Sequence, residues 1–231
     1  MQYGYRSPPT IAFGRRFPLQ TDMPFHYRFF YGCWKVLFTA IFRLIFNTRI
    51  VGHDRVPNDG GLLLVCNHIS FADPPLVGVA TPRLIEFMAM VELFRNRLLR
   101  LLMRSVCTFP VDRSRVDHAA AREAIRRLRA GRCVCIFPEA GIRLAKQSVL
   151  GGDPVLRPGA ETLASLSGAA VLPVIIRDSR KPYVWRNWFR RETMSVTFGY
   201  PFSLWRPPHR PTKDDRRQII RDELLKTVEL N

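Results

Sequence analysis

The sequence of 231 residues lacks the common signatures of metal and nucleotide binding. It has no Cys-x-x-Cys pair and no Cys-x-x-Cys…His-x-x-His spacing, so we expect no metal site. It also has neither a glycine-rich dinucleotide fingerprint nor a phosphate-binding P-loop, and we therefore expect no resident cofactor. A Pro-rich polar stretch precedes the first apolar run, which is not the layout of a secretory signal peptide.

Acidic residues are scarce. The chain has 19 Asp and Glu against 36 Lys and Arg, which leaves a net charge of +17. Such an excess favours an anionic partner, which can be a nucleic acid, an anionic lipid surface or a phosphorylated substrate. Charge alone does not choose among these partners, and a basic surface that serves solubility is the alternative.

Cysteines are few and odd in number, which argues against a disulfide framework. Most of them lie in apolar runs typical of strands, so we interpret them as reduced core residues of a cytosolic protein. The five are Cys33, Cys66, Cys107, Cys133 and Cys135.

Apolar residues make up 47% of the chain, which is enough for one large domain with its own core. From residue 51 to residue 231, short apolar runs alternate with helical patterns. This alternation predicts an α/β domain with a mostly parallel central sheet flanked by helices. We expect strands at 61–66, 83–90, 107–111, 133–137, 170–176 and 194–198, and helices from Asp73 and at 92–104, 118–130, 159–166 and 216–228.

The N-terminal part of the chain differs from the rest. Residues 1–23 are rich in Pro, Arg and Gly, and we expect a flexible arm there. Residues 24–50 predict an amphipathic helix with a polar stripe of Arg28, Lys35, Thr39, Arg43 and Asn47. Its cations interrupt the apolar run, so we expect the helix to lie in an anionic membrane surface without crossing it. This predicts a peripheral protein on the cytoplasmic face of the cell membrane. A helix packed on the domain's own core is the alternative.

The motif Asn67-His68-Ile69-Ser70-Phe71-Ala72-Asp73 follows a predicted buried strand. Sites in parallel sheets collect where strands end, and a turn in this loop lets Asp73 reach His68. A carboxylate that fixes the imidazole makes it a general base for activating a hydroxyl. The alternative is a loop histidine beside an Asp that only caps the next helix.

Three further features accompany this motif. Phe137-Pro138-Glu139-Ala140-Gly141 places a carboxylate after another buried strand, where Glu139 can hold a substrate, pair with an arginine or remain a solvated loop acid. Arg113 follows the strand 109–111, and its guanidinium suits a phosphate, or else a salt bridge to Asp112 or Asp117. Pro173 within the apolar run 171–174 indicates an edge strand or a bulge beside a site.

In this order, the motifs resemble those of the glycerolipid (lysophospholipid) acyltransferase family over residues 50–200. The resemblance implies that His68 abstracts the proton of an acceptor hydroxyl and that Asp73 orients His68. It also implies a phosphate-binding role for Arg113 and a site role for Glu139, with Asn67, Ser70, Gly141 and Arg143 completing the substrate-binding set. The family usually carries an arginine three residues after the glutamate, whereas this chain has Ile142 there and Arg143 one residue later.

The resemblance implies an O-acyltransferase of phospholipid synthesis. The acyl donor is acyl-CoA or acyl-carrier protein, and the acceptor is a lysophospholipid such as 1-acylglycerol 3-phosphate. Two alternatives remain: a thioesterase built on Cys66 and His68, and a non-catalytic basic module that binds membranes or nucleic acid. We expect no nucleic-acid partner. A His–Asp pair facing a cleft beside Arg113 discriminates the enzyme from the binding module.

Overall fold

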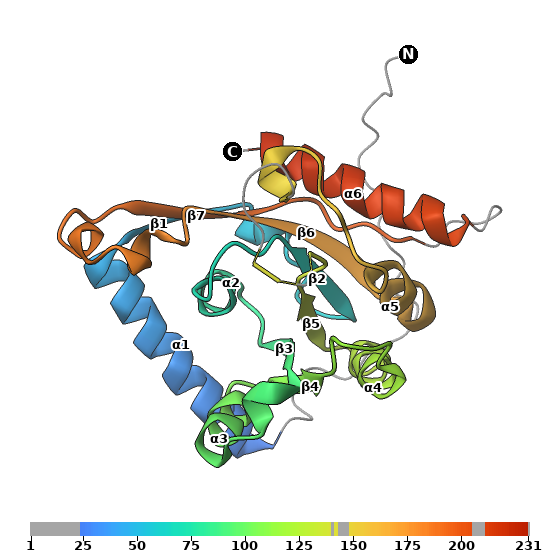
Figure 1. The fold of residues 1–231 in the computed structure, drawn as a ribbon, viewed down its shortest axis with the longest axis horizontal. Helices are drawn as coiled ribbons and strands as arrows, with labels where there is room; N and C mark the ends of the chain where they lie inside the picture. Colours follow the sequence, from blue (N-terminus) through green and yellow to red (C-terminus); the bar gives the residue numbers. More distant parts are fainter. Residues whose placement is uncertain (1–23, 140, 143–147, 205–210, 231) are drawn as a thin grey trace.

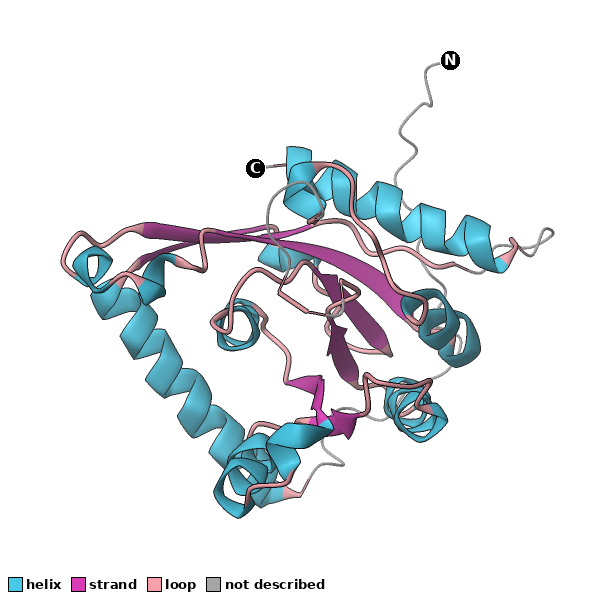
Figure 2. Cartoon of the chain, in the orientation of Figure 1, coloured by secondary structure: helices cyan, strands magenta, loops and turns pink. Residues whose placement is uncertain are grey.

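The computed structural model describes residues 24–139, 141–142, 148–204 and 211–230. Its strands form one sheet in the order β1-β7-β6-β2-β5-β3-β4, and every neighbouring pair is parallel except β6 and β7 (Figures 1 and 2). The predicted, mostly parallel α/β sheet is therefore confirmed. The strands are β1 Asn47–Val51, β2 Leu62–Cys66, β3 Ile85–Met90, β4 Phe109–Val111, β5 Cys133–Ile136, β6 Ala170–Arg177 and β7 Thr193–Phe198. The predicted arm at 1–23 lies outside the described residues.

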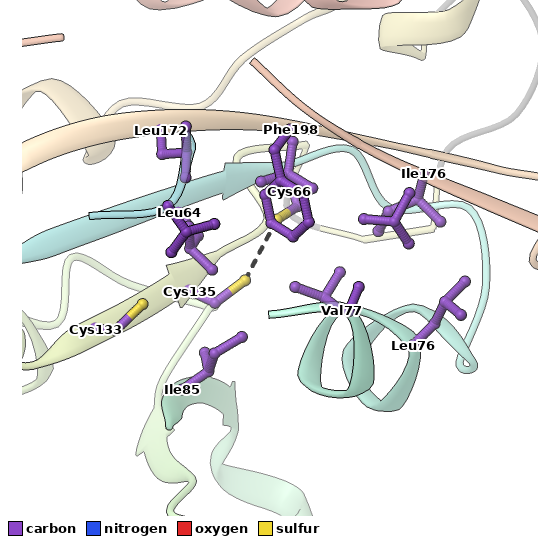
Figure 3. Close-up of a cluster of buried hydrophobic side chains, with 14 of the residues drawn as sticks. Leu64, Cys66, Leu76, Val77, Ile85, Cys133, Cys135, Leu172, Ile176 and Phe198 are labelled. Atoms are coloured by element: carbon purple, nitrogen blue, oxygen red, sulfur yellow. Dashed lines mark hydrogen bonds between the residues drawn. The ribbon is translucent and has the colours of Figure 1, made fainter. Parts of the chain in front are cut away.

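Helices cover both faces of the sheet, and strand β2 shows how. Its side chains alternate between two core clusters, because successive strand residues point to opposite faces. Leu62, Leu64 and Cys66 pack with helices α1 (Phe25–Ile45) and α2 (Asp73–Ala80), as Figure 3 shows for part of this cluster. Leu63 and Val65 pack with the helices α4 His118–Arg129, α5 Ala160–Ser167 and α6 Lys213–Glu229.

Two predicted helices differ from the structure more than the others do. The helix predicted over 24–50 ends at Ile45, and residues 47–51 form the edge strand β1, which spans the predicted boundary after residue 50. The helix predicted over 92–104 is divided into a 3₁₀ turn, Val91–Phe94, and helix α3, Arg97–Ser105. The side chain of Asn96 accepts hydrogen bonds from the first turn of α3 and so begins the helix there.

The expectation that Pro173 marks an edge strand is wrong, because β6 lies between β7 and β2. The other expectation, a bulge, is confirmed, and the bulge lies in the segment after β7 that pairs with β6. Val174 pairs with Phe198, and Val171 pairs with Phe202, so one extra residue stands opposite β6 between these two pairs. Pro173 has no N–H to donate, and its carbonyl accepts from Gly199 across this bulge at 2.9 Å.

Helix α1 turns one face to the domain and the other outward. Lys35, predicted on the polar stripe toward lipid headgroups, instead faces inward and donates to the carbonyl of Thr81 at 2.6 Å. Burial accordingly lowers the pKa of Lys35. The exposed face is mainly apolar and carries Phe25, Phe29, Phe30, Val36, Leu37 and Leu44, while His26, Arg28 and Arg43 are also exposed on this helix. In the described part of the chain, no helix combines the length and hydrophobicity that crossing a bilayer demands.

Candidate active site

The site begins where β2 ends, at Asn67. The Asn67 side-chain amide donates to the carbonyl of Ile176 at 2.9 Å, and its carbonyl oxygen accepts from the N–H of Ile176 at 2.7 Å. The side chain thereby continues the pairing of β2 with β6 by one residue, while the backbone is free to leave the sheet. Asn67 is fully buried, and this pairing fixes where the turn containing His68 starts.

His68 and Asp73 form the predicted pair. The imidazole Nδ1 lies 2.8 Å from Asp73 Oδ2. Because a carboxylate can only accept, Nδ1 of the neutral ring carries its proton and Nε2 is left as the acceptor. His68 lines a cavity, and its ring stacks on Phe137 with centroids 4.3 Å apart, which holds the plane of the imidazole.

The carboxylate of Asp73 is fully buried and is the hub of the turn. It does not act as the N-cap predicted for it, because Asp73 is the first residue of α2 and Ala72 is the N-cap. Oδ2 instead accepts from the N–H groups of Ile69 and Ser70 at 2.7 and 2.8 Å. Oδ1 accepts from the hydroxyl of Ser179, just after β6. These donors compensate the buried charge.

Glu139 holds the same turn from the strand on the other side of β2. One carboxylate oxygen accepts from the N–H of His68 at 2.9 Å and the other from the N–H of Val149 at 2.7 Å. The side chain is fully buried; burial raises the pKa of Glu139, and the two backbone donors oppose that rise. Its burial and these two contacts exclude a solvated loop acid, and the substrate-binding role implied for Glu139 stays a prediction.

A cavity of about 430 Å³ extends from His68 between α1, α2, α3 and β3. Its volume lies within the usual range for small-molecule sites. The wall is mainly apolar, and Arg113 also lines it, so the His–Asp pair faces a cavity that contains this guanidinium. Apolar lining residues include Trp34, Phe38, Val79, Phe87, Leu93 and Leu102.

Arg113 is half-buried and forms no hydrogen bond or ion pair with a described residue. The salt bridge proposed for it is absent, because Asp112 pairs with Arg115 at 2.8 Å and Asp117 caps α4. Burial lowers the pKa of Arg113, the Glu92 carboxylate opposes this, and the nearby Arg157 guanidinium adds to the lowering. A half-buried guanidinium at the wall of an apolar cavity, without an ion-pair partner among the described residues, makes a place for an anion.

The other predicted site residues take different positions. The Ser70 hydroxyl lies 3.1 Å from that of Tyr183, and Tyr183 also accepts from the N–H of Phe71 at 2.7 Å. Gly141 is half-buried in the loop after Glu139. Arg143 lies outside the described residues. The substrate-binding roles of these residues and of Asn67 stay predictions.

Sequence reasoning did not find Ser179 and Tyr183. The usable signal was their position, because polar residues that follow β6 reach the same sheet edge as those that follow β2.

The sequence also offered Cys66 as the nucleophile of an alternative thioesterase. The Cys66 thiol lies in the core, 3.5 Å from Cys135 Sγ, and is not among the residues that line the cavity (Figure 3).

The sheet, the His68–Asp73 pair and the adjoining apolar cavity indicate an α/β enzyme. The sequence model of the family described as Acyltransferase matches residues 47–177, more than half of the chain. The chain therefore belongs to the acyltransferase family, and it is an acyltransferase enzyme.

Known proteins agree with this membership. A 1-acyl-sn-glycerol-3-phosphate acyltransferase of Bacillus subtilis is 28% identical over 167 residues, which are 72% of this chain and 79% of the relative. One of Streptococcus pneumoniae is 29% identical over 68% of this chain and 56% of the relative. The crystal structure of the 1-acyl-sn-glycerophosphate (LPA) acyltransferase PlsC from Thermotoga maritima shares the fold. Its TM-score is 0.67 at 21% identity, covering 88% of this chain and 81% of that one.

Replacing Ser179 with Ala removes one donor to the buried Asp73 carboxylate and leaves the others. We expect kcat to fall about tenfold, since a hydrogen bond to a charged group contributes about 1.5–3 kcal/mol. The KM values for the acyl donor and for the acyl acceptor should change little. Steady-state kinetics measures this. The matched control is Ser167→Ala, whose hydroxyl bonds only to carbonyls and an N–H at the end of α5. Wild-type kcat in Ser179→Ala, with Ser167→Ala also unchanged, would show that Ser179 does not position Asp73.

Proposed function

We propose that this enzyme transfers a fatty acyl group from a thioester donor to the hydroxyl of a lysophospholipid acceptor, 1-acylglycerol 3-phosphate, in phospholipid synthesis. The observation that carries the proposal is the His68–Asp73 pair, 2.8 Å apart and opening into an apolar cavity that also contains Arg113. The names of the relatives from Bacillus subtilis and Streptococcus pneumoniae support this acceptor.

The chemistry follows from the protonation of the imidazole. Nε2 of His68 accepts the proton of the acceptor hydroxyl while the oxygen attacks the thioester carbonyl. The tetrahedral intermediate collapses with loss of the thiolate, which leaves as the free thiol once it takes up a proton from the imidazolium. Asp73 stabilises the imidazolium that exists between these two proton transfers. An ester forms, a thioester breaks, and no acyl-enzyme is needed.

The acceptor phosphate fits the position of Arg113. This guanidinium lies at the cavity wall without an ion-pair partner among the described residues, and Arg157 is close enough to lower its pKa. A phosphate would neutralise both positive charges, and a guanidinium can hold two of its oxygens at once. The apolar remainder of the cavity suits the acyl chain, and the donor is acyl-CoA or acyl-carrier protein.

A lipid acceptor agrees with the exposed apolar side chains on the outer surface of α1. We propose that this apolar face lies on an anionic membrane at the cytoplasmic side, as a peripheral contact. Helix α3 adjoins the N-terminal half of α1, where Trp34 Nε1 donates to Ser105 at 3.0 Å. Leu98 and Leu101 of α3 are exposed beside three arginines of the same helix, a composition suited to an anionic interface.

Replacing His68 with Ala should lower acyl transfer by at least about 100-fold, because a positioned general base contributes roughly 10²–10⁴-fold. The measurement is transfer of a labelled acyl group to 1-acylglycerol 3-phosphate. His118→Ala, on the exposed first residue of α4, is the matched control and should retain activity. If the folded His68→Ala protein keeps more than a tenth of wild-type turnover, His68 is not the base.

Arg113→Ala should raise the KM for the acceptor by roughly 10- to 100-fold, because a charge-assisted contact to the phosphate is lost. The KM for the thioester donor should change little. Arg115→Ala is the control, since Arg115 is exposed and pairs only with Asp112. Equal increases in both KM values would place Arg113 in a general electrostatic role instead of the acceptor site.

Peripheral docking predicts how the full chain binds to membranes and which treatments release it. We expect it to bind vesicles that contain anionic lipid more tightly than neutral vesicles, and to bind less as salt is raised, because exposed cations are screened. Flotation and extraction experiments measure both effects. Association that survives high salt and alkaline carbonate would contradict peripheral docking.

A further inference from the structure

The segment between β6 and β7, residues 178–192, exposes large aromatic side chains. Trp185 is 70% exposed and Phe189 81% exposed, and the two rings contact one another edge to face with centroids 6.1 Å apart. Trp188 is also exposed, with its ring nitrogen bonded to the carbonyl of Pro182. An apolar cluster of this size on a surface marks a contact with a partner or a membrane.

Positive charge surrounds this cluster. The only acidic residues of the segment, Asp178 and Glu192, both pair with Lys181. Its arginines are all exposed, and none forms an ion pair with a described residue. They are Arg180, Arg186, Arg190 and Arg191. Unneutralised cations beside exposed aromatic rings complement an anionic surface with an apolar interior.

The segment touches two other parts of the molecule. Arg191 donates to the carbonyl of Arg43 in the last turn of α1 at 2.9 Å, and Figure 1 shows the segment at the C-terminal end of that helix. At its start, Ser179 donates to the Asp73 carboxylate and Tyr183 accepts from the N–H of Phe71. One short segment therefore links the outward-facing helix to the turn that holds His68.

We propose that residues 180–191 form a second membrane-docking element, which inserts Trp185 and Phe189 at the headgroup boundary of an anionic bilayer. The proposal rests on the proposed function, in which the acceptor is a membrane lipid. Trp residues favour this boundary because the ring is apolar and its N–H is polar. The Trp185–Phe189 contact makes one apolar cluster instead of two separate platforms for stacked bases, which favours a bilayer over a nucleic acid.

The first test compares the full-length wild type with the double variant Trp185→Ala/Phe189→Ala. The probes are phosphatidylcholine vesicles with and without phosphatidylglycerol, and binding is measured by flotation. We expect the variant to bind at least about tenfold more weakly to the anionic vesicles, because burying one such side chain contributes about that factor or more. Leu166→Ala/Ile219→Ala is the matched control. Both residues are exposed on helices that cover the face of the sheet opposite to α1 and α2.

The charges are tested separately. Arg186→Gln/Arg190→Gln should weaken binding to the anionic vesicles about 30-fold, taking about 1 kcal/mol for each cation near the surface. Binding to phosphatidylcholine alone should not change. A loss of the same size on both kinds of vesicle would overturn recognition of anionic lipid.

Turnover distinguishes docking from a structural role. On a short-chain acceptor that dissolves as monomers, Trp185→Ala/Phe189→Ala should match the wild type; on acceptor embedded in anionic vesicles, it should be at least about tenfold slower. Unchanged vesicle binding, or an equal loss of turnover on both acceptors, overturns the proposal. Binding of a short RNA that is lost in the variant and blocks vesicle binding also overturns it. If the wild type acylates neither acceptor, the proposed function fails, and the flotation result still decides the docking.

Discussion

The buried carboxylate of Asp73 is the interaction on which the rest of the active site depends. A charge in this position would cost several kcal/mol if it lacked donors. It receives them from His68, from two N–H groups of its own turn and from Ser179. Because these donors belong to segments that follow two neighbouring strands, one charge fixes the His68 imidazole, the turn and the beginning of the segment after β6.

Three adjacent strands cooperate in this arrangement. In the sheet, β2 lies between β6 and β5, and each of the three contributes a residue beyond its carboxyl end. Asn67 binds the end of β6, and Glu139, after β5, binds the N–H of His68. Glu139 thus holds the backbone of His68, and Lys35 and Arg113 are the described Lys and Arg side chains that line the cavity beside it.

Much of the fold could be predicted because local patterns decide it. The apolar run of β2 and the Ala- and Arg-rich helix α4 can be predicted from the pattern of apolar and polar residues alone. β1 could not be predicted this way, because Asn47–Val51 is a mostly exposed edge strand whose partner, β7, lies about 145 residues further along the chain. In the site, the His68–Asp73 contact is local and followed from spacing. Ser179 contacts Asp73 across 106 residues of sequence, and only the sheet order brings them together.

Helix α1 ends at Ile45 and β1 begins at Asn47, so the buried Phe46 alone joins them. A connection of one residue is not a flexible tether, so α1 keeps its position relative to the sheet. Under the proposed docking, the imidazole of His68 stands at a fixed height above the lipid, and the acceptor must rise to meet it. Each methylene that leaves the bilayer costs roughly 0.8 kcal/mol unless the apolar cavity beside His68 takes it up. Under this docking, the height of His68 above the lipid sets how much of the acyl chain the cavity has to shelter.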